Sequence, residues 1–165
     1  MNIFYLLINI LVLALPIAIL EITLEKDKGW GAGFSKDTWY GRIIGEKNKF
    51  LQFLAKMAGV PYFFGYAVFM YFFLVPALLI LEYFFLIPDG VFLLATYAGI
   101  LFVEDFLWFV FNPYFPSLTE LSKGPNGNIW WHKRWVRIGG NHYLPASYFG
   151  GMSVVMALVI YSYLR

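Results

Sequence analysis

The sequence predicts an all-α integral membrane protein, a four-transmembrane-helix bundle with a structured interfacial layer on its cytoplasmic side. Three observations predict this class. The chain of 165 residues is 61% hydrophobic and only 13% charged, whereas soluble domains carry about 25% charged residues. Four long segments are nearly free of charge. Eleven of the twelve Lys and Arg residues fall in two of the connections between these segments.

The apolar segments have the length that a transmembrane helix requires, which is about 20 predominantly apolar residues. The first meets ITLEKDK instead of a small-residue cleavage site, so we interpret it as a retained helix and not as a signal peptide. Pro-Asp-Gly at 88–90 predicts a tight turn between the second and third spans. We predict a single membrane domain, residues 1–165, with spans at about 3–22, 59–86, 90–112 and 143–163.

The two long connections, 23–58 and 113–142, lie on the same side of a four-span bundle. Because they hold eleven of the twelve basic residues, the positive-inside rule places them in the cytoplasm and both termini on the non-cytoplasmic side. The third segment reaches membrane length only if it continues through Glu104 and Asp105. Without a third span, the two basic connections would lie on opposite faces of the membrane. The charge pattern therefore supports a third span that contains both acids.

The first connection ends in a segment, residues 46–58, with an amphipathic helical pattern. It places Phe50, Leu51, Leu54, Met57 and Ala58 on one face, flanked by lysines. This pattern is typical of a helix lying in the headgroup plane, and it is equally typical of the first turns of the second span. Five of the six tryptophans also fall in the connections, as an interfacial aromatic belt would. We expect lipid contacts from Lys47, Lys49, Lys56, Trp131 and Arg134.

The second connection carries helix and turn signals. Ser117 and Glu120 fit a capping box, and Gly124 fits the end of that short helix. The segment WWHKRW at 130–135 mixes basic and aromatic residues, a combination also found at surfaces that bind nucleic acid. Beside a bilayer, and with a net charge of only +2, anionic headgroups are the better partner. We therefore expect membrane lipids and no nucleic acid.

Two adjacent acids inside a transmembrane segment require an explanation. An ionised acid at mid-span costs about 2.5–3.5 kcal/mol on insertion scales, and such residues face the bundle interior and mark a site or pathway. Glu104 and Asp105 lie eight and seven residues before Asn112, about 10–12 Å deep at 1.5 Å per residue. The alternative is a structural ion pair with a basic side chain that folds back, namely Lys133, Arg134 or Arg137.

Other titratable residues belong to the same cytoplasmic layer. Glu21 and Glu25, four residues apart, share one face of the first span, and His132 lies in the second connection. We predict catalytic roles for Glu104, Asp105 and His132, with a buried acid as general base and the histidine as acid. The sharper alternative is a site for a divalent metal such as Zn, Fe or Mn. Its candidate ligands are Glu21, Glu25, Glu104, Asp105 and His132.

The two acids are not expected to be equivalent. The helical face of Glu104 continues through Trp108 and Asn112, in steps of four residues. Asp105 points about 100° away from that face, so it needs a direct partner from another helix or from residues 130–135. If a site exists, at least one of the two carboxylates should lie close to Glu21, Glu25 or His132.

Composition excludes several chemistries. No cysteine is present, which excludes thiol and disulfide chemistry, and two histidines are too few for a site built on several histidine boxes. The first hypothesis is a small membrane enzyme that acts on a lipid or other apolar substrate at the cytoplasmic leaflet. The second is a non-catalytic subunit, scaffold or lipid-binding module that packs on a membrane-protein partner or a second copy. The third is a small proton-coupled carrier, because buried acids also serve as proton relays.

Overall fold

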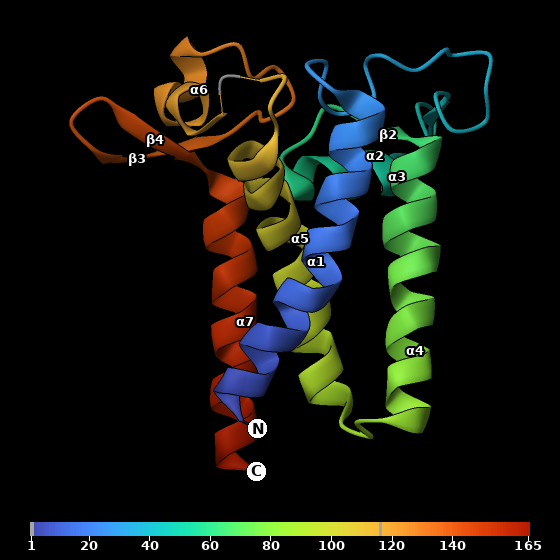
Figure 1. Ribbon diagram of the computed structural model, residues 1–165, viewed down its shortest axis with the longest axis vertical. Coiled ribbons are helices and arrows are strands. Elements are labelled where there is room, and N and C mark those ends of the chain that lie inside the picture. Colours follow the sequence, from blue (N-terminus) through green and yellow to red (C-terminus); the bar gives the residue numbers. More distant parts are fainter. Residues whose placement is uncertain (1, 116) are drawn as a thin grey trace.

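A computed structural model describes residues 2–115 and 117–165 of the chain. Four helices in it are long and apolar enough to cross a membrane. They stand side by side, with both termini at one end and the two long connections at the other (Figure 1). The four are α1 (Ile3–Glu25), a continuous second helix (Gly65–Phe85), α5 (Gly90–Phe111) and α7 (Ala146–Leu164).

The second helix changes its hydrogen-bond register part of the way along. It begins as α3 (Gly65–Phe69), widens into the π-helical turn η1 (Met70–Leu74) and continues as α4 (Val75–Phe85). In the π register Pro76 would have to donate to the Tyr71 carbonyl, but proline has no N–H. The Tyr97 hydroxyl of α5 donates to that carbonyl instead, at 2.7 Å. Tyr71, whose side chain belongs to the site, lies within this π turn.

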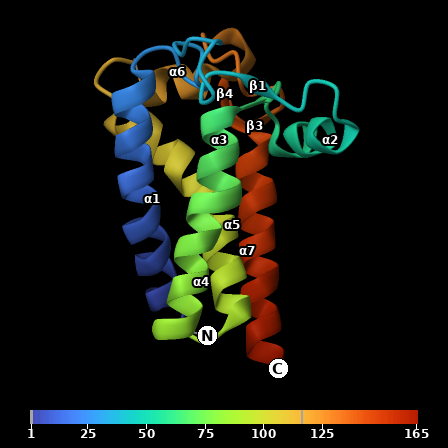
Figure 2. The same cartoon turned by 90° about the vertical axis from the view of Figure 1, so that its right-hand side faces the viewer.

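The helix α5 is the centre of the bundle and packs against α1, α4 and α7 (Figure 2). Glycines allow two of these contacts to be close. A Cβ added at Gly99 would lie 2.4 Å from the Ile10 side chain of α1, and one at Gly151 would lie 2.6 Å from Phe102 of α5. Small residues at helix crossings are typical of helices that associate in membranes.

The second helix begins at Gly65 and not near residue 59, which corrects the predicted boundary. Residues 49–58 form a separate helix, α2 (Lys49–Ala58), which ends at Gly59 with a positive φ of 77°. The strand β2 (Phe63–Phe64) follows and pairs antiparallel with β1 (Ile43–Ile44). Gly59 and Pro61 end α2 locally, and the pairing with β1 keeps Phe63 and Phe64 extended before the second long helix begins. α2 lies crosswise to the long helices (Figure 2).

The predicted apolar face of α2 is wrong in detail. Leu51, Leu54 and Ala55 turn toward the protein, whereas Phe50, Phe53 and Met57 are exposed. The helix therefore has one apolar stripe on the protein and another facing outward. One alternative for this segment, the first turns of the second span, is excluded, because α2 is not part of the second long helix.

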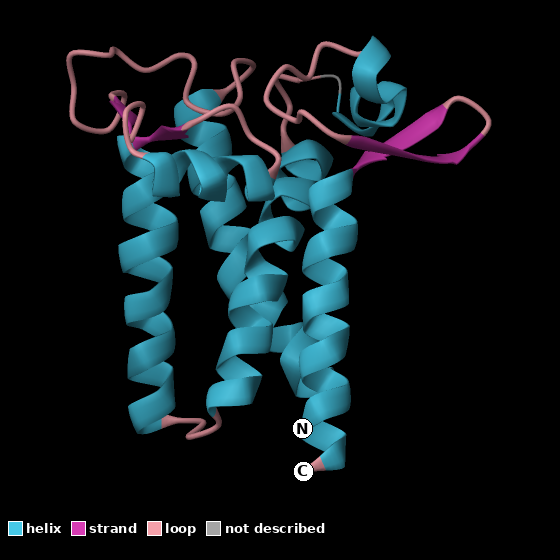
Figure 3. Ribbon diagram, turned by 180° about the vertical axis from the view of Figure 1, so that it is seen from behind, coloured by secondary structure: helices cyan, strands magenta, loops and turns pink. Residues whose placement is uncertain are grey.

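The second connection folds over the end of α5. It contains α6 (Ser117–Lys123), the 3₁₀ turn η2 (Gly124–Asn126) and a hairpin of β3 (Trp135–Gly139) and β4 (His142–Pro145). The fourth long helix starts at Ala146 and not at 143, because β4 occupies the preceding residues. The chain thus carries two small antiparallel sheets beside its helices (Figure 3), a departure from the all-α prediction.

The predicted capping box falls partly outside the described residues, since nothing is described of the Ser117 side chain. Glu120 has other partners. Its carboxylate accepts hydrogen bonds from the Lys123 ammonium and, at 3.1 Å, from the backbone N–H of Asn128. The bond from Lys123, followed by the backbone bond, holds the pKa of Glu120 below its ordinary value. Gly124 ends the helix with a positive φ of 58°, as predicted.

Candidate functional site

Glu104 and Asp105 face different neighbours, as expected from their positions on α5. The side chain of Glu104 is 2% exposed and lies between α1 and the second long helix. Asp105 is turned toward α7 and the connection that precedes it. Adjacent helical residues point about 100° apart, and the central position of α5 gives each acid its own interface.

The first cluster, here named the Asp105 group, contains Asp105, His132 and Tyr148. Asp105 Oδ2 lies 3.1 Å from His132 Nε2 and accepts a hydrogen bond from the Tyr148 hydroxyl. The expected direct partner from residues 130–135 is therefore present. The imidazole is buried, and aromatic rings surround it, with the Trp135 ring at a centroid distance of 5.6 Å. The Asp105 side chain is 23% exposed, so this group borders the protein surface.

The second cluster, the Glu104 group, contains Glu21, Tyr71 and Glu104. The Tyr71 hydroxyl lies 2.7 Å from Glu104 Oε2 and 3.0 Å from Glu21 Oε1. A phenol has one hydrogen to donate. The Tyr71 hydroxyl can therefore form hydrogen bonds with both carboxyl groups only if one of these groups donates the second hydrogen. The three side chains come from three different helices.

Glu25 has its own partners next to the Glu104 group. It is 4% exposed, and its Oε1 accepts hydrogen bonds from the Tyr66 hydroxyl and, at 2.7 Å, from the backbone N–H of Gly31. Gly31 lies in the glycine-rich segment after α1, where Trp30 donates from its indole to the Tyr62 carbonyl at 2.7 Å. The fold of that segment thus fixes the carboxylate of Glu25.

The acids are not neutralised by basic side chains. Among the described residues, no Lys or Arg forms an ion pair with Glu21, Glu25, Glu104 or Asp105. The three basic residues that could have folded back, Lys133, Arg134 and Arg137, are exposed. The structural ion-pair alternative therefore has no support. Two buried polar atoms on one face of α5, Glu104 Oε1 and Trp108 Nε1, have no hydrogen-bond partner in the described part of the chain.

The metal hypothesis has no support either. Within residues 2–115 and 117–165, no three His, Asp or Glu side chains gather in a group that could hold a metal ion. The five candidate ligands are divided instead. Glu21 and Glu104 share Tyr71, Glu25 binds Tyr66, and Asp105 and His132 face the other side of α5.

The residues predicted to contact lipid have different environments. Lys47, Lys49, Lys56 and Arg134 are exposed at the end of the bundle that carries the long connections. Trp131 is only 3% exposed, and its ring stacks on Phe109 at a centroid distance of 5.9 Å. The Trp131 ring is therefore not presented to a headgroup.

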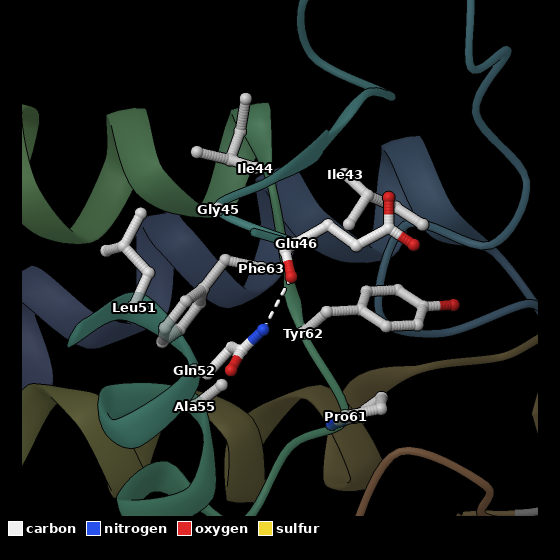
Figure 4. A pocket seen from close by; sticks show the side chains of 10 residues that line it. All are labelled: Ile43, Ile44, Gly45, Glu46, Leu51, Gln52, Ala55, Pro61, Tyr62 and Phe63. Carbon is white, nitrogen blue, oxygen red and sulfur yellow. Dashed lines mark hydrogen bonds between the residues drawn. The ribbon is translucent and has the colours of Figure 1, made fainter. Parts of the chain in front are cut away.

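Two cavities lie away from the acids. The first, of about 290 Å³, lies between β1, α2 and β2, where Gln52 donates to the Glu46 carbonyl at 2.5 Å (Figure 4). The second is an open groove of about 600 Å³ between α4 and α5, near the turn that joins them, with Arg165 at its edge. Neither cavity is lined by a residue of the Asp105 group or the Glu104 group.

Sequence reasoning missed the phenols. Tyr66 and Tyr71 hydrogen-bond buried carboxyl groups and Tyr148 hydrogen-bonds the partly exposed Asp105, but the chain has twelve tyrosines. The only local signal was that all three lie in or at the ends of apolar spans, where a hydroxyl needs a partner.

Comparison with protein-family models, with curated proteins and with solved structures finds no match to this chain. What the protein does must therefore be inferred from its own geometry.

Proposed function

We propose that the four long helices span a membrane, with the connections that contain α2, α6 and the β3–β4 hairpin in the cytoplasm and both termini on the opposite side. The support is the outer surface of the bundle. Of the described residues of α7, only Tyr148 is buried, and large apolar side chains such as Phe84 and Phe85 are more than 70% exposed. Such a surface is unfavourable in water and favourable in lipid. Eleven of the twelve basic residues lie at the proposed cytoplasmic end.

Single cysteines test this arrangement, because the chain has none of its own. We expect Ser35→Cys and Asn126→Cys to react with an impermeant maleimide only from the cytoplasmic side of sealed vesicles. Pro88→Cys, in the exposed turn between α4 and α5, should react from the other side. Labelling of Ser35→Cys and Asn126→Cys from opposite sides would overturn the four-span arrangement.

We further propose that the Asp105 group is the acid–base site of an enzyme that acts on a lipid or other apolar substrate at the cytoplasmic leaflet. One observation carries this proposal, the contact of a carboxylate with an imidazole at 3.1 Å inside an apolar layer. A carboxylate that holds one ring nitrogen of a histidine fixes its tautomer, so that the other nitrogen exchanges protons with a substrate. With Asp105 on Nε2, the exchanging atom is Nδ1 of His132.

Each member of the group has a role in this proposal. Asp105 accepts two hydrogen bonds and balances the charge of the imidazole when it takes up a proton. Tyr148 holds the Asp105 carboxylate in place and fixes its direction. The approach to Asp105 is apolar, because Phe102 and Phe106 pack around the Tyr148 ring at centroid distances of 6.4 and 6.5 Å. An apolar approach to a carboxylate–imidazole pair favours a lipid-like substrate over a water-soluble one.

The two histidines provide a matched test. The purified protein would be reconstituted with a total lipid extract, and the lipids would be followed by mass spectrometry over time. We expect the wild-type protein and His142→Gln, which changes an exposed histidine, to convert a lipid species. Asp105→Asn and His132→Gln should remain folded and leave the lipid profile unchanged. Identical profiles for the wild type and both site variants would contradict the enzyme proposal and favour a non-catalytic role.

The Glu104 group supports a second candidate, a proton-coupled carrier. Two carboxyl groups joined by one phenol, with no basic partner among the described residues, are suited to hold and pass a proton. This candidate predicts that proteoliposomes with a pH-sensitive dye inside take up protons when a pH gradient is imposed with a mixture of small solutes outside, and that Glu104→Gln abolishes the uptake. Uptake that is equal in wild-type and Glu104→Gln vesicles would exclude this role.

A further inference from the structure

The β3–β4 hairpin extends sideways from the bundle, beyond α7, at the end that carries the long connections. Figures 1 and 3 show this projection from opposite sides, with α6 above the hairpin and the top of α7 below its base. β4 ends at Pro145, and α7 begins at the next residue. The base of the hairpin therefore lies directly at the start of α7.

The strand register gives the hairpin two different faces. Arg137 pairs with Tyr143 and Val136 pairs with Leu144, so these two pairs point in opposite directions. Tyr143 packs on Gly124 of η2, where an added Cβ would lie 2.4 Å from the Tyr143 Cβ. The face that carries Arg137 and Tyr143 is therefore the one that α6 and η2 cover.

The opposite face is apolar and open. It carries Val136, which is 37% exposed, and the strand continues to Ile138, which is 54% exposed and is the extra residue at the register shift between Arg137 and Gly139. Leu144, across from Val136, packs at the base of the hairpin against the cluster that contains Trp108 and Tyr148. An isolated two-stranded hairpin is only marginally stable in water. A hairpin with an uncovered apolar face needs an apolar surface against that face.

We propose that this hairpin is a lateral arm that rests on the cytoplasmic leaflet, with Val136 and Ile138 in the headgroup–acyl boundary. The proposal rests on the membrane insertion of the four helices. The chain passes directly from the hairpin into α7, whose described side chains are mostly exposed or half-buried. Two exposed basic residues, Lys133 and Arg134, lie at the base of the arm, and their charge complements anionic headgroups.

A second protein strand is a poorer occupant of this region. Strand addition uses the edge of a hairpin and not its face. The edge is interrupted by a register shift between Arg137 and Gly139, and Gly139 and Gly140 have φ values of +155° and +51°. Arg137 also donates from its side chain to the Gly140 carbonyl, which folds the tip back on itself. Such irregularities are known to protect edges from pairing.

Spin labels at single cysteines in the full chain test the arm. The protein would be placed at one copy per nanodisc, in a bilayer of neutral lipid with an anionic fraction. Collisions of the label with oxygen, which prefers lipid, and with a water-soluble nickel chelate would be measured for three variants. Val136→Cys probes the apolar face, Arg137→Cys is its neighbour on the opposite face, and Leu78→Cys in α4 reports on insertion of the helices.

We expect the Val136→Cys label to be shielded from nickel, accessible to oxygen, and about 5–10 Å deep in the boundary region. The Arg137→Cys label should be accessible to nickel. If Leu78→Cys reports lipid while Val136→Cys is as accessible to nickel as Arg137→Cys, the proposed arm is refuted and the membrane insertion stands. If Leu78→Cys itself reports water, the membrane insertion fails and the arm fails with it. A label at Val136→Cys that neither reagent reaches indicates a protein cover and also refutes the arm. Ile138→Cys repeats the measurement at a second exposed position of the same strand.

Discussion

Replacement of Tyr71 by Phe removes the single hydroxyl that joins two buried carboxyl groups. Phe keeps the ring, so no cavity is created and the packing of η1 is retained. The hydroxyl lies 2.7 Å from Glu104 Oε2 and 3.0 Å from Glu21 Oε1, and both carboxyl groups are buried. A hydrogen bond to a charged group contributes about 1.5–3 kcal/mol and a neutral one about 0.5–1.5 kcal/mol. The loss of one of each costs about 2–4 kcal/mol.

Thermal unfolding of the purified protein in detergent measures this cost. For a chain of this size 1 kcal/mol corresponds to about 2–4 °C, so Tyr71→Phe should lower Tm by roughly 4–16 °C. The matched control is Tyr97→Phe, which removes one neutral hydrogen bond to a backbone carbonyl. Its expected cost is about 1 kcal/mol, or about 2–4 °C.

A double-mutant cycle with Glu104→Gln separates the shared contact from general destabilisation. The Gln amide donates hydrogen bonds, so it can supply Glu21 with the hydrogen that Tyr71→Phe removes. We expect Tyr71→Phe to cost less in the Glu104→Gln background, with a coupling energy of about 0.5–3 kcal/mol. If Tyr71→Phe costs no more than Tyr97→Phe, or if the two substitutions are additive, the phenol does not join the carboxyl groups and the Glu104 group is not a unit.

Three further outcomes are expected. Gly99→Ala, at the crossing where an added Cβ would lie 2.4 Å from a buried isoleucine of α1, should destabilise the protein by about 1–3 kcal/mol, whereas Gly150→Ala, with nothing within 4 Å, should not. Partial burial acts to raise the pKa of Asp89, but hydrogen bonds from Arg165 and two backbone N–H groups hold it below its ordinary value. Asp89→Asn keeps the N-cap but loses the ion pair with Arg165, so it should lower the free energy of unfolding by about 0.2–1 kcal/mol at pH 7. This difference from the wild type should vanish as the pH falls below about 4, and thermal unfolding would measure it. Replacement of Lys47, Lys49 and Lys56 by Gln should weaken the binding of anionic lipid by about 1 kcal/mol per lysine, so less anionic lipid should co-purify. An unchanged amount of lipid would show that these side chains are merely solvated.

The sequence predicted well those features that depend on one segment alone. Length and hydrophobicity located the four long helices, and Pro-Asp-Gly located the turn before α5, where Asp89 accepts hydrogen bonds from Val91 and Phe92. Helical periodicity predicted that Glu104 and Asp105 differ and that Asp105 needs a direct partner from another helix or from residues 130–135. Each of these inferences needs only the local geometry of a helix.

Features that depend on distant segments were not predicted. Gly59 and Pro61 are local signals for the break before the second long helix, but its start at Gly65 follows the residues that pair with β1, and two-residue strands leave no recognisable pattern. The roles of Tyr66 and Tyr71 depend on the rotation of the second helix relative to α1. Tyr71 lies in the π turn, and its carbonyl accepts a hydrogen bond from a hydroxyl of α5. No window of sequence contains these contacts.

The position of α5 explains why two acids are adjacent in the chain. A single acid on a central helix can serve one interface, but α5 packs on α1 and the second helix on one side and on α7 on the other. Adjacent residues, about 100° apart, reach both sides at the same depth. The longer Glu104 reaches Tyr71 and, through it, Glu21, whereas the shorter Asp105 meets His132 and Tyr148. The backbone of α5 therefore joins an enclosed carboxyl pair to a histidine group at the protein surface, and any movement of α5 relative to its neighbours changes both.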